Sequence, residues 1–406
     1  MKKMMGRAET HTEAARIVFA DLCASSVSAL GMSTWLGSSG GTIGSTVYSG
    51  TAGIAWALAE YARFSGDARA ADMAKGAMSY AVRHAGQIPR AQRFGFYSGW
   101  AGIIFAAAWV GELLEDESIR FQGSELLARL SSEQCSAEFD IVSGTAGTVL
   151  ALSSLGPVLG DGALELAYRA AMHLRSARCT PQHLSVTASW KPPGKRRALA
   201  LTGLAHGAAG AGWALLELWA PRQNESWMKE LAYAAFGYED ALFDIEKQNW
   251  PDLRHYPDWR ATKLLPPPFQ TAWCHGAGGI AISRARGFEL TGDEGLAEMA
   301  RRGALILREN SEQADAVERD FCLCHGTTGS AELLEILEER TGVAVPRALI
   351  DRIMNASADY LLERDEREGA AGLMLGKAGI AAALLRRSGA TAISPLLPLM
   401  PDSRSV

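Results

Sequence analysis

A short glycine motif that recurs seven times constrains the fold of this chain more than any other feature. Gly-x-x-Gly pairs occur at positions 50/53, 99/102, 144/147, 207/210, 276/279, 326/329 and 376/379. Each pair precedes a segment, such as 54–64, 211–220 or 280–290, whose apolar residues recur at helix spacing. More amphipathic segments, such as 125–130 and 349–363, lie between the pairs. Seven copies in register predict repeated helix pairs, each with an apolar inner helix and an amphipathic outer helix.

The glycines favour a closed ring over an open solenoid. A residue without a side chain permits close backbone approach, which is needed where seven helix N-termini crowd toward one axis. We therefore predict an all-α fold, an α/α toroid of seven inner and seven outer helices, as a single domain over residues 1–406. Two longer gaps between repeats contain insertions near 179–199 and 249–270. We expect both insertions to form loops or a short hairpin over one mouth of the ring.

Composition narrows the functional classes. The chain is 48% hydrophobic and 21% charged, which excludes a disordered chain or a coiled coil. A formal net charge of −5 argues against nucleic acid as a partner. Six cysteines are too few for a disulfide scaffold, and no secretory signal opens the sequence. The longest apolar run, 99–111, falls short of the roughly 18 to 20 residues of a transmembrane segment. These features predict a cytoplasmic protein with reduced thiols and no membrane span.

The seven repeats differ in the two positions before the first glycine. The nearer position holds, in order, Ser49, Ser98, Ser143, His206, His275, His325 and Leu375. The position before it holds Tyr48, Tyr97, Val142, Ala205, Cys274, Cys324 and Met374. Cys-His pairs thus occupy equivalent places in two consecutive repeats. Neighbouring helices pack about 8 to 10 Å apart, so these side chains can meet on one zinc ion.

Spacing alone does not decide how many of these four residues bind the metal. Cys274, His275, Cys324 and His325 together would make a closed structural site, whereas three ligands would leave a position for water or substrate. We favour the open site. Cys322 lies outside the aligned positions and is interpreted as a packing residue.

Two further residues and three cysteines complete the candidates. His206 occupies the same repeat position as the metal-site histidines, without a cysteine beside it, and is interpreted as functional. Asp140 stands four residues before Gly144, where a carboxylate serves equally well as a helix cap or as part of a site. The remaining cysteines are interpreted as structural; they are Cys23, Cys135 and Cys179.

These motifs resemble the lanthionine synthetase C-like family. The resemblance rests on the Gly-x-x-Gly series, on WCHGAGGI at 273–280 and on CHG at 324–326, and it extends from about residue 48 to 385. It implies an α/α toroid with one catalytic zinc, whose ligands fall on Cys274, Cys324 and His325. The residue after the first cysteine varies in that family, so His275 is not implied as a ligand. The family's catalytic histidine and aspartate fall on His206 and Asp140.

The resemblance also implies a reaction and its partners. In a dehydrated precursor peptide, a cysteine thiolate held by zinc adds to the β-carbon of dehydroalanine or dehydrobutyrine, which forms a lanthionine or methyllanthionine thioether. His206 would protonate the resulting enolate, and Asp140 would orient it. A separate dehydratase and a transporter are expected partners, because the chain is too short to include a dehydratase half.

Two positions depart from the pattern of class I cyclases. Where those enzymes have an arginine four residues before the first cysteine and a tyrosine after it, this chain has Gln270 and His275. The runs WCHGAGGIAISR and NWPDLR are more similar to the cyclase half of class II synthetases. Arg254 or Arg284 would then supply the missing positive charge.

Three alternative functions remain open. A LanC-like protein could add glutathione or another thiol to dehydrated residues with the same ligands. A non-catalytic adaptor could keep the zinc site only to bind a peptide or glutathione. A toroid like that of protein prenyltransferases also activates a thiol on zinc, but seven repeats count against its six-hairpin barrel.

Overall fold

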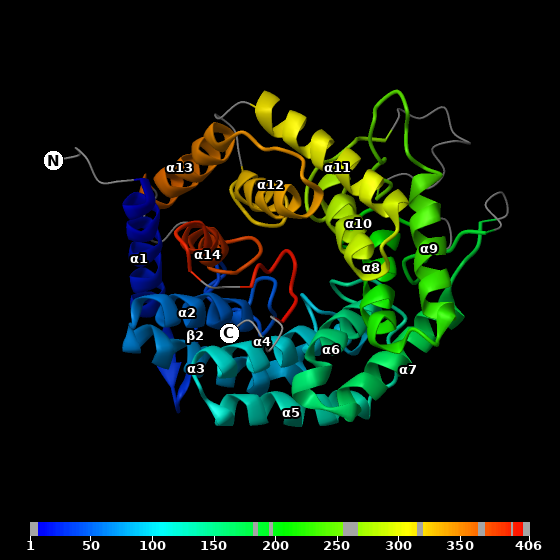
Figure 1. The fold of residues 1–406 in the computed structure, drawn as a ribbon. Helices are drawn as coiled ribbons and strands as arrows, with labels where there is room; N and C mark the ends of the chain where they lie inside the picture. The colour runs from blue at the N-terminus through cyan, green and yellow to red at the C-terminus, as the bar shows by residue number, and fades with distance from the viewer. Residues whose placement is uncertain are drawn as a thin grey trace.

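The computed structural model of the chain describes residues 7–181, 186–194, 198–254, 267–314, 320–363, 370–390 and 393–400. In this structure the seven repeats form two concentric rings of helices (Figure 1). The inner helices are α2 (Thr51–Ser65), α4 (Trp100–Leu113), α6 (Thr145–Leu159), α8 (Ala208–Trp219), α10 (Ala277–Thr291), α12 (Thr327–Thr341) and α14 (Lys377–Arg387). The outer helices are α1 (Arg7–Ser25), α3 (Ala68–His84), α5 (Glu117–Ser131), α7 (Asp161–Ala177), α9 (Ser226–Asp240), α11 (Glu294–Gln313) and α13 (Arg347–Glu363).

The inner ring is closed. Each inner helix packs against the next one in sequence, and α14 packs against α2. The N-terminal helix α1 packs on α14 and α13, so it is the outer partner of the last repeat. The predicted α/α toroid with seven inner and seven outer helices is confirmed, and the two ends of the helical array complete the ring between them.

Burial explains why the two kinds of helix differ in sequence. Inner helix α4 is buried along almost its whole length, from Trp100 to Gly111, as its apolar sequence requires. Outer helices bury one face only, and α3 and α5 begin at the aspartate caps Asp67 and Asp116. The only strands in the described part of the chain are β1 (Val27–Ala29) and β2 (Met32–Thr34), which form a small antiparallel hairpin.

The second glycine of every motif is required by its own repeat. A Cβ atom added there would collide with the carbonyl oxygen of the residue six positions earlier, as at Gly53 against Val47 and at Gly329 against Leu323. Crowding among seven helix N-termini is the reason that the sequence suggests for these glycines, whereas the contact that all seven second glycines share is with the loop that leads into their own helix. Gly276 alone among the first glycines also needs a positive φ, of 91°.

The loops that enter the inner helices are joined by backbone hydrogen bonds. The N–H of Cys274 donates to the carbonyl of Cys324 (3.3 Å), that of Cys324 to Met374 (3.1 Å), and that of Met374 to Tyr48 (2.8 Å). Ala205 likewise donates to Cys274 at 3.0 Å. Residues in the same repeat position therefore lie side by side around the axis, which sets the register of every side chain that reaches the centre.

The C-terminal segment, residues 393–400, lies inside the ring of inner helices, where Figure 1 shows it in red. The carbonyl of Pro395 accepts a hydrogen bond from Tyr97 Oη (2.6 Å), and that of Leu396 accepts one from Trp273 Nε1 (3.0 Å). Leu396 is fully buried. These two bonds attach the segment to the loops of the second and fifth repeats.

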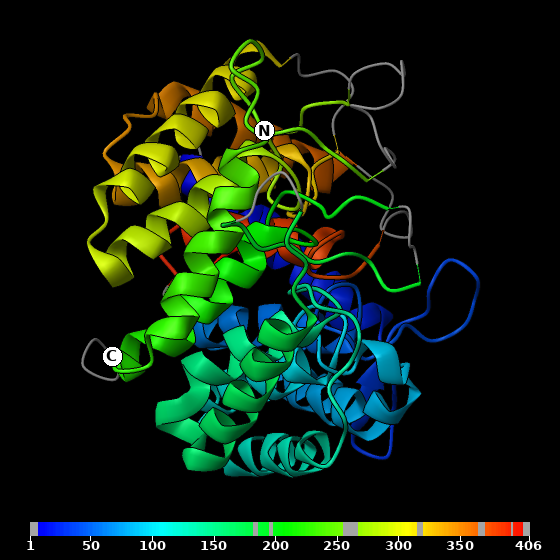
Figure 2. The ribbon, with the colours of Figure 1, turned by 90° about the vertical axis from the view of Figure 1, so that its right-hand side faces the viewer.

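The two predicted insertions are described only in part, because 182–185, 195–197 and 255–266 lie outside the described residues. Their described residues form isolated antiparallel bridges, Cys179 with Ser189 and Pro251 with Phe269. In Figure 2 the segment between α7 and α8 and the β1–β2 hairpin lie toward the same end of the toroid. None of the helices in the described ranges has the length and hydropathy to cross a membrane.

Candidate metal centre and acid–base pair

Three side chains that can bind a metal lie together in the loops that precede two neighbouring inner helices. Donor atoms of Cys274, Cys324 and His325 all lie within 4.8 Å of one another. The loops before α10 and α12 carry them, and the backbone hydrogen bond from Cys274 to Cys324 holds these loops together. Two thiols and one imidazole form a donor set that suits zinc and leaves one of its four usual coordination positions to another ligand. The residues present therefore fit the metal that the family resemblance implies.

The two thiols interact strongly with each other. The hydrogen bond from the Cys324 thiol lowers the pKa of Cys274 well below its usual value, and His325 lowers it further. The same hydrogen bond, followed by burial, raises the pKa of Cys324. One sulfur of the pair is thus prepared as a thiolate, which is the form that binds metal.

Asp320 holds the imidazole of His325. Its Oδ2 lies 3.1 Å from His325 Nε2, and about half of the imidazole surface is exposed. A carboxylate on one ring nitrogen is the usual partner of a metal-bound histidine, because it orients the ring. Cys322 is buried, and its sulfur accepts the backbone N–H of His325 at 3.5 Å. Asp320, Cys322 and His325 also form a second group of neighbouring donors.

His275 is not part of the donor cluster of the described residues. Its ring is buried and stacks on His206, with 5.8 Å between ring centroids. Burial lowers the pKa of His275 to about 4, so this imidazole is neutral. The four-ligand arrangement left open by the spacing is therefore not the one observed.

His206 and Asp140 form a hydrogen-bonded pair beside the cluster. His206 Nδ1 lies 2.7 Å from Asp140 Oδ2, and the backbone N–H of Ser143 donates to Asp140 Oδ1 at 2.6 Å. The carboxylate is thus fixed through both oxygens. Burial lowers the pKa of His206, but the hydrogen bond and charge of Asp140 outweigh it, so the pKa lies above its ordinary value. Next to the cluster, this pair can hold and release a proton.

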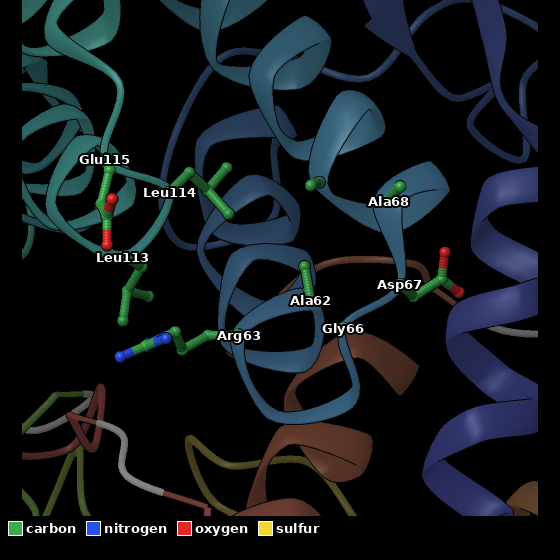
Figure 3. A pocket seen from close by; sticks show the side chains of 9 residues that line it. Ala62, Arg63, Gly66, Asp67, Ala68, Leu113, Leu114 and Glu115 are labelled. Atoms are coloured by element: carbon green, nitrogen blue, oxygen red, sulfur yellow. The ribbon is translucent and has the colours of Figure 1, made fainter.

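A cavity of about 240 Å³ opens beside this pair. It is lined by Gln92, Glu138, Phe139, Asp140, Ser143, Pro192, Pro193, Leu201 and His206. The two prolines belong to the first predicted insertion, so that loop contributes a wall of the site. A second cavity, shown in Figure 3, lies where α2 and α4 end and holds Arg63 and Glu115 but no cysteine or histidine.

The two arginines considered for the missing cation have different surroundings. Arg284 is fully buried, lies over the Phe236 ring and pairs with Glu239 at 3.1 Å, so it is a core residue. Arg254 is 41% exposed and its guanidinium binds both oxygens of buried Asp252. Its charge acts on Cys274, Cys324 and His206. The expectation for Arg284 was wrong because its helix turns that side chain outward to α9.

Hydrogen bonds join the segment 249–254 both to the loop that carries His206 and to the loop that carries Cys274. The carbonyl of Pro251 accepts the Thr202 hydroxyl (2.6 Å), four residues before His206. On the other side, Asn249 Nδ2 donates to the carbonyl of Gln270 (3.1 Å), four residues before Cys274. Sequence reasoning placed this stretch at the start of the second insertion and named Arg254, but it did not identify Asp252 as the partner that holds the guanidinium.

Sequence reasoning also missed a contact to the metal cluster. Tyr48 Oη donates a hydrogen bond to Cys324 Sγ at 3.0 Å. Tyr48 occupies the same repeat position as Cys274 and Cys324, so its register already indicated that it faces the axis.

Comparison with known proteins gives two kinds of match. The family model described as "Lanthionine synthetase C-like protein" matches residues 42–396. No curated protein matches the sequence. Among solved structures, the chain is similar to nisin cyclase, with 16% identity, a TM-score of 0.66, and coverage of 87% of this chain and 92% of that one. It also matches the α-1,6-mannanase GH76A from Salegentibacter sp. HEL1_6, with 10% identity, a TM-score of 0.49, and coverage of 93% and 98%.

Proposed function

Because this chain belongs to the lanthionine synthetase C-like family, we propose that it is a zinc-dependent lanthipeptide cyclase. Its substrate would be a dehydrated precursor peptide, supplied by a separate dehydratase. The observation that carries the proposal is the meeting of Cys274, Cys324 and His325 beside the Asp140–His206 pair. A metal site with three protein ligands next to a proton donor suits thiol addition better than a purely structural role.

Zinc, when bound by these three residues, would supply a coordination position that favours the thiolate form of a substrate cysteine. In the addition, the sulfur–carbon bond forms at the β-carbon of the dehydro residue and the carbon–carbon π bond breaks. The electron pair moves to the carbonyl oxygen as an enolate. The thiol proton leaves before attack, and one proton returns at the α-carbon, so the mass of the peptide does not change.

His206 is the proposed proton donor to the α-carbon. The raised pKa keeps its imidazole protonated at higher pH than an ordinary histidine. The backbone hydrogen bond from Ala205 to Cys274 keeps the imidazole next to the metal cluster. Asp140 fixes the ring, because it binds Nδ1 and leaves Nε2 for the substrate.

Arg254 is the proposed cation for the enolate. It carries a permanent charge, and Asp252 holds its guanidinium at the edge of the site. A fixed positive charge near the developing oxyanion lowers the barrier, because no reorganisation is needed as the charge forms. In this proposal Arg254 does the work of the arginine that is absent at Gln270.

The test uses the full chain and a dehydrated peptide with one free cysteine. We expect about one zinc per chain, loss of the free thiol and no change in peptide mass. Cys324→Ala is expected to lose both zinc and cyclisation. Zinc far below one equivalent, or no loss of thiol with zinc present, contradicts the proposal.

The same assay separates the alternatives. With glutathione present and a peptide that has a dehydro residue but no cysteine, a mass gain of one glutathione would identify a glutathione-adding enzyme instead. Peptide binding with zinc present and no change in thiol or mass would identify an adaptor.

A further inference from the structure

The phenol of Tyr48 contacts a metal-ligand sulfur across the place where the first and last repeats close the ring. Its Oη donates to Cys324 Sγ at 3.0 Å, although 276 residues separate the two in sequence. Tyr48 precedes α2 in the first repeat and Cys324 precedes α12 in the sixth. The contact therefore exists only because the ring is closed.

The backbone holds this contact in place. Cys324 donates its N–H to Met374, and Met374 donates its N–H to the carbonyl of Tyr48 at 2.8 Å. These three residues fill the same position in the sixth, seventh and first repeats. In the seventh repeat, which lies between them, the two positions before the first glycine hold the apolar residues Met374 and Leu375. The phenol therefore contacts a sulfur that is two repeats away around the ring. Met374 itself is buried, which gives this wall of the site a fixed surface.

The repeat does not dictate where this phenol points. Tyr97 fills the same position in the second repeat, yet its Oη donates to the carbonyl of Pro395 and the side chain is fully buried. Tyr97 thus anchors the C-terminal segment, whereas Tyr48 is half-buried and donates to the sulfur. A phenol is a donor throughout the neutral pH range.

A hydrogen bond to a metal-ligand thiolate has two chemical effects. It orients the sulfur, and it withdraws electron density, so the ligand becomes a weaker nucleophile and the metal a stronger Lewis acid. Both effects matter where a third thiolate, that of the substrate, must be the one that reacts. Cys274 differs from Cys324 in this respect, since its own hydrogen bonds join it to Cys324 and His325.

We propose that Tyr48 is a positioning residue of the metal centre, whose hydrogen bond holds Cys324 Sγ and suppresses the reactivity of this sulfur in favour of the substrate thiolate. This inference rests on the proposed zinc function. It assigns a role to the first repeat, which contributes no metal ligand, and it explains why a phenol stands on the wall opposite His206.

The test compares metal-loaded Tyr48→Phe with the wild type. The variant is expected to bind zinc about 10- to 100-fold more weakly, the usual effect of removing a hydrogen bond to a metal ligand. With Co²⁺ in place of zinc, its sulfur-to-metal charge-transfer band should shift. Iodoacetamide should alkylate Cys324 faster in the metal-loaded variant, as located by peptide mass spectrometry.

Two further variants serve as a control and as a rescue. Tyr80→Phe removes an exposed phenol hydroxyl on α3 that donates to Thr42, and it should leave metal affinity and spectrum unchanged. Tyr48→Gln keeps a donor at the position and should recover part of the affinity, whether or not Tyr48→Phe folds well. Wild-type affinity, spectrum and alkylation rate in Tyr48→Phe or in an equally folded Tyr48→Leu would overturn the inference. A wild type that binds no metal would instead overturn the proposed function.

Discussion

Nδ1 of His206 lies 2.7 Å from Oδ2 of Asp140, and the two residues come from loops 66 positions apart. The carboxylate also accepts the backbone N–H of Ser143 and is almost fully buried, so it cannot rotate away. The histidine is 39% exposed at its side chain and faces the cavity. One member of the pair is thus held by the fold while the other can meet a substrate.

Replacing His206 by asparagine should separate metal binding from catalysis. The variant is expected to keep its zinc, because His206 is outside the donor cluster. Cyclisation should fall by about 10²- to 10⁴-fold, the range for loss of a general acid. Metal analysis and thiol loss measured on the same sample test this, and a metal-free variant would show that the ligand assignment is wrong.

Replacing Asp140 by asparagine should move the alkaline limb of the pH profile. Asp140 raises the pKa of His206 against the effect of burial, so its removal lowers that pKa. The protonated acid is then lost at lower pH, and the fall in kcat at high pH should begin earlier than in the wild type. A profile of kcat against pH that is reduced in height but unmoved would mean that His206 is not the titrating acid.

The same pair should make stability depend on pH. The pKa of His206 is higher in the folded chain than the ordinary 6.5. Its contribution to the free energy of unfolding is therefore fully present below pH 6.5 and is lost as the pH rises through the folded-state pKa. Denaturant titrations of wild type and His206→Asn should differ most at acidic pH, and an equal difference at all pH values would rule out this linkage.

Replacing Arg254 by methionine should lower kcat and spare the metal. The expected loss is about 10- to 100-fold, smaller than for a buried oxyanion donor because the guanidinium is 41% exposed. Arg301→Met is the matched control, since Arg301 is also 41% exposed and pairs with carboxylates on outer helix α11. Activity in Arg254→Met equal to that of Arg301→Met would remove Arg254 from the site.

Replacing Arg284 by alanine should act on stability alone. This guanidinium is fully buried against Glu239, whose other oxygen accepts the backbone N–H groups of Gly203 and Ala209. Breaking the pair leaves a buried carboxylate without its cation and should cost about 3 to 5 kcal/mol of unfolding free energy. Chemical denaturation measures the loss, and a stable variant with reduced kcat would instead support a catalytic role for Arg284.

The glycine repeat was sufficient to predict the toroid, because each helix pair buries its apolar face only against its neighbours. The same register indicated which loops face the axis and therefore which cysteines and histidines lie near one another. It also placed Tyr48 and Tyr97 in equivalent positions, but it could not distinguish the sulfur contact of one from the carbonyl contact of the other.

The sequence by itself therefore determined the architecture and the set of residues that approach the centre of this protein. Tertiary structure alone decided which of them touch. Tyr48 meets Cys324 only because α14 packs on α2, and the His275 ring stacks on His206 instead of joining the donor cluster. The sequence offered Arg284 and Arg254 equally as the missing cation. The structure buries Arg284 against Glu239, whereas Arg254 is partly exposed and is held by Asp252. Periodicity sets position along a helix or around a ring, whereas direction and partner depend on ring closure, loop path and packing.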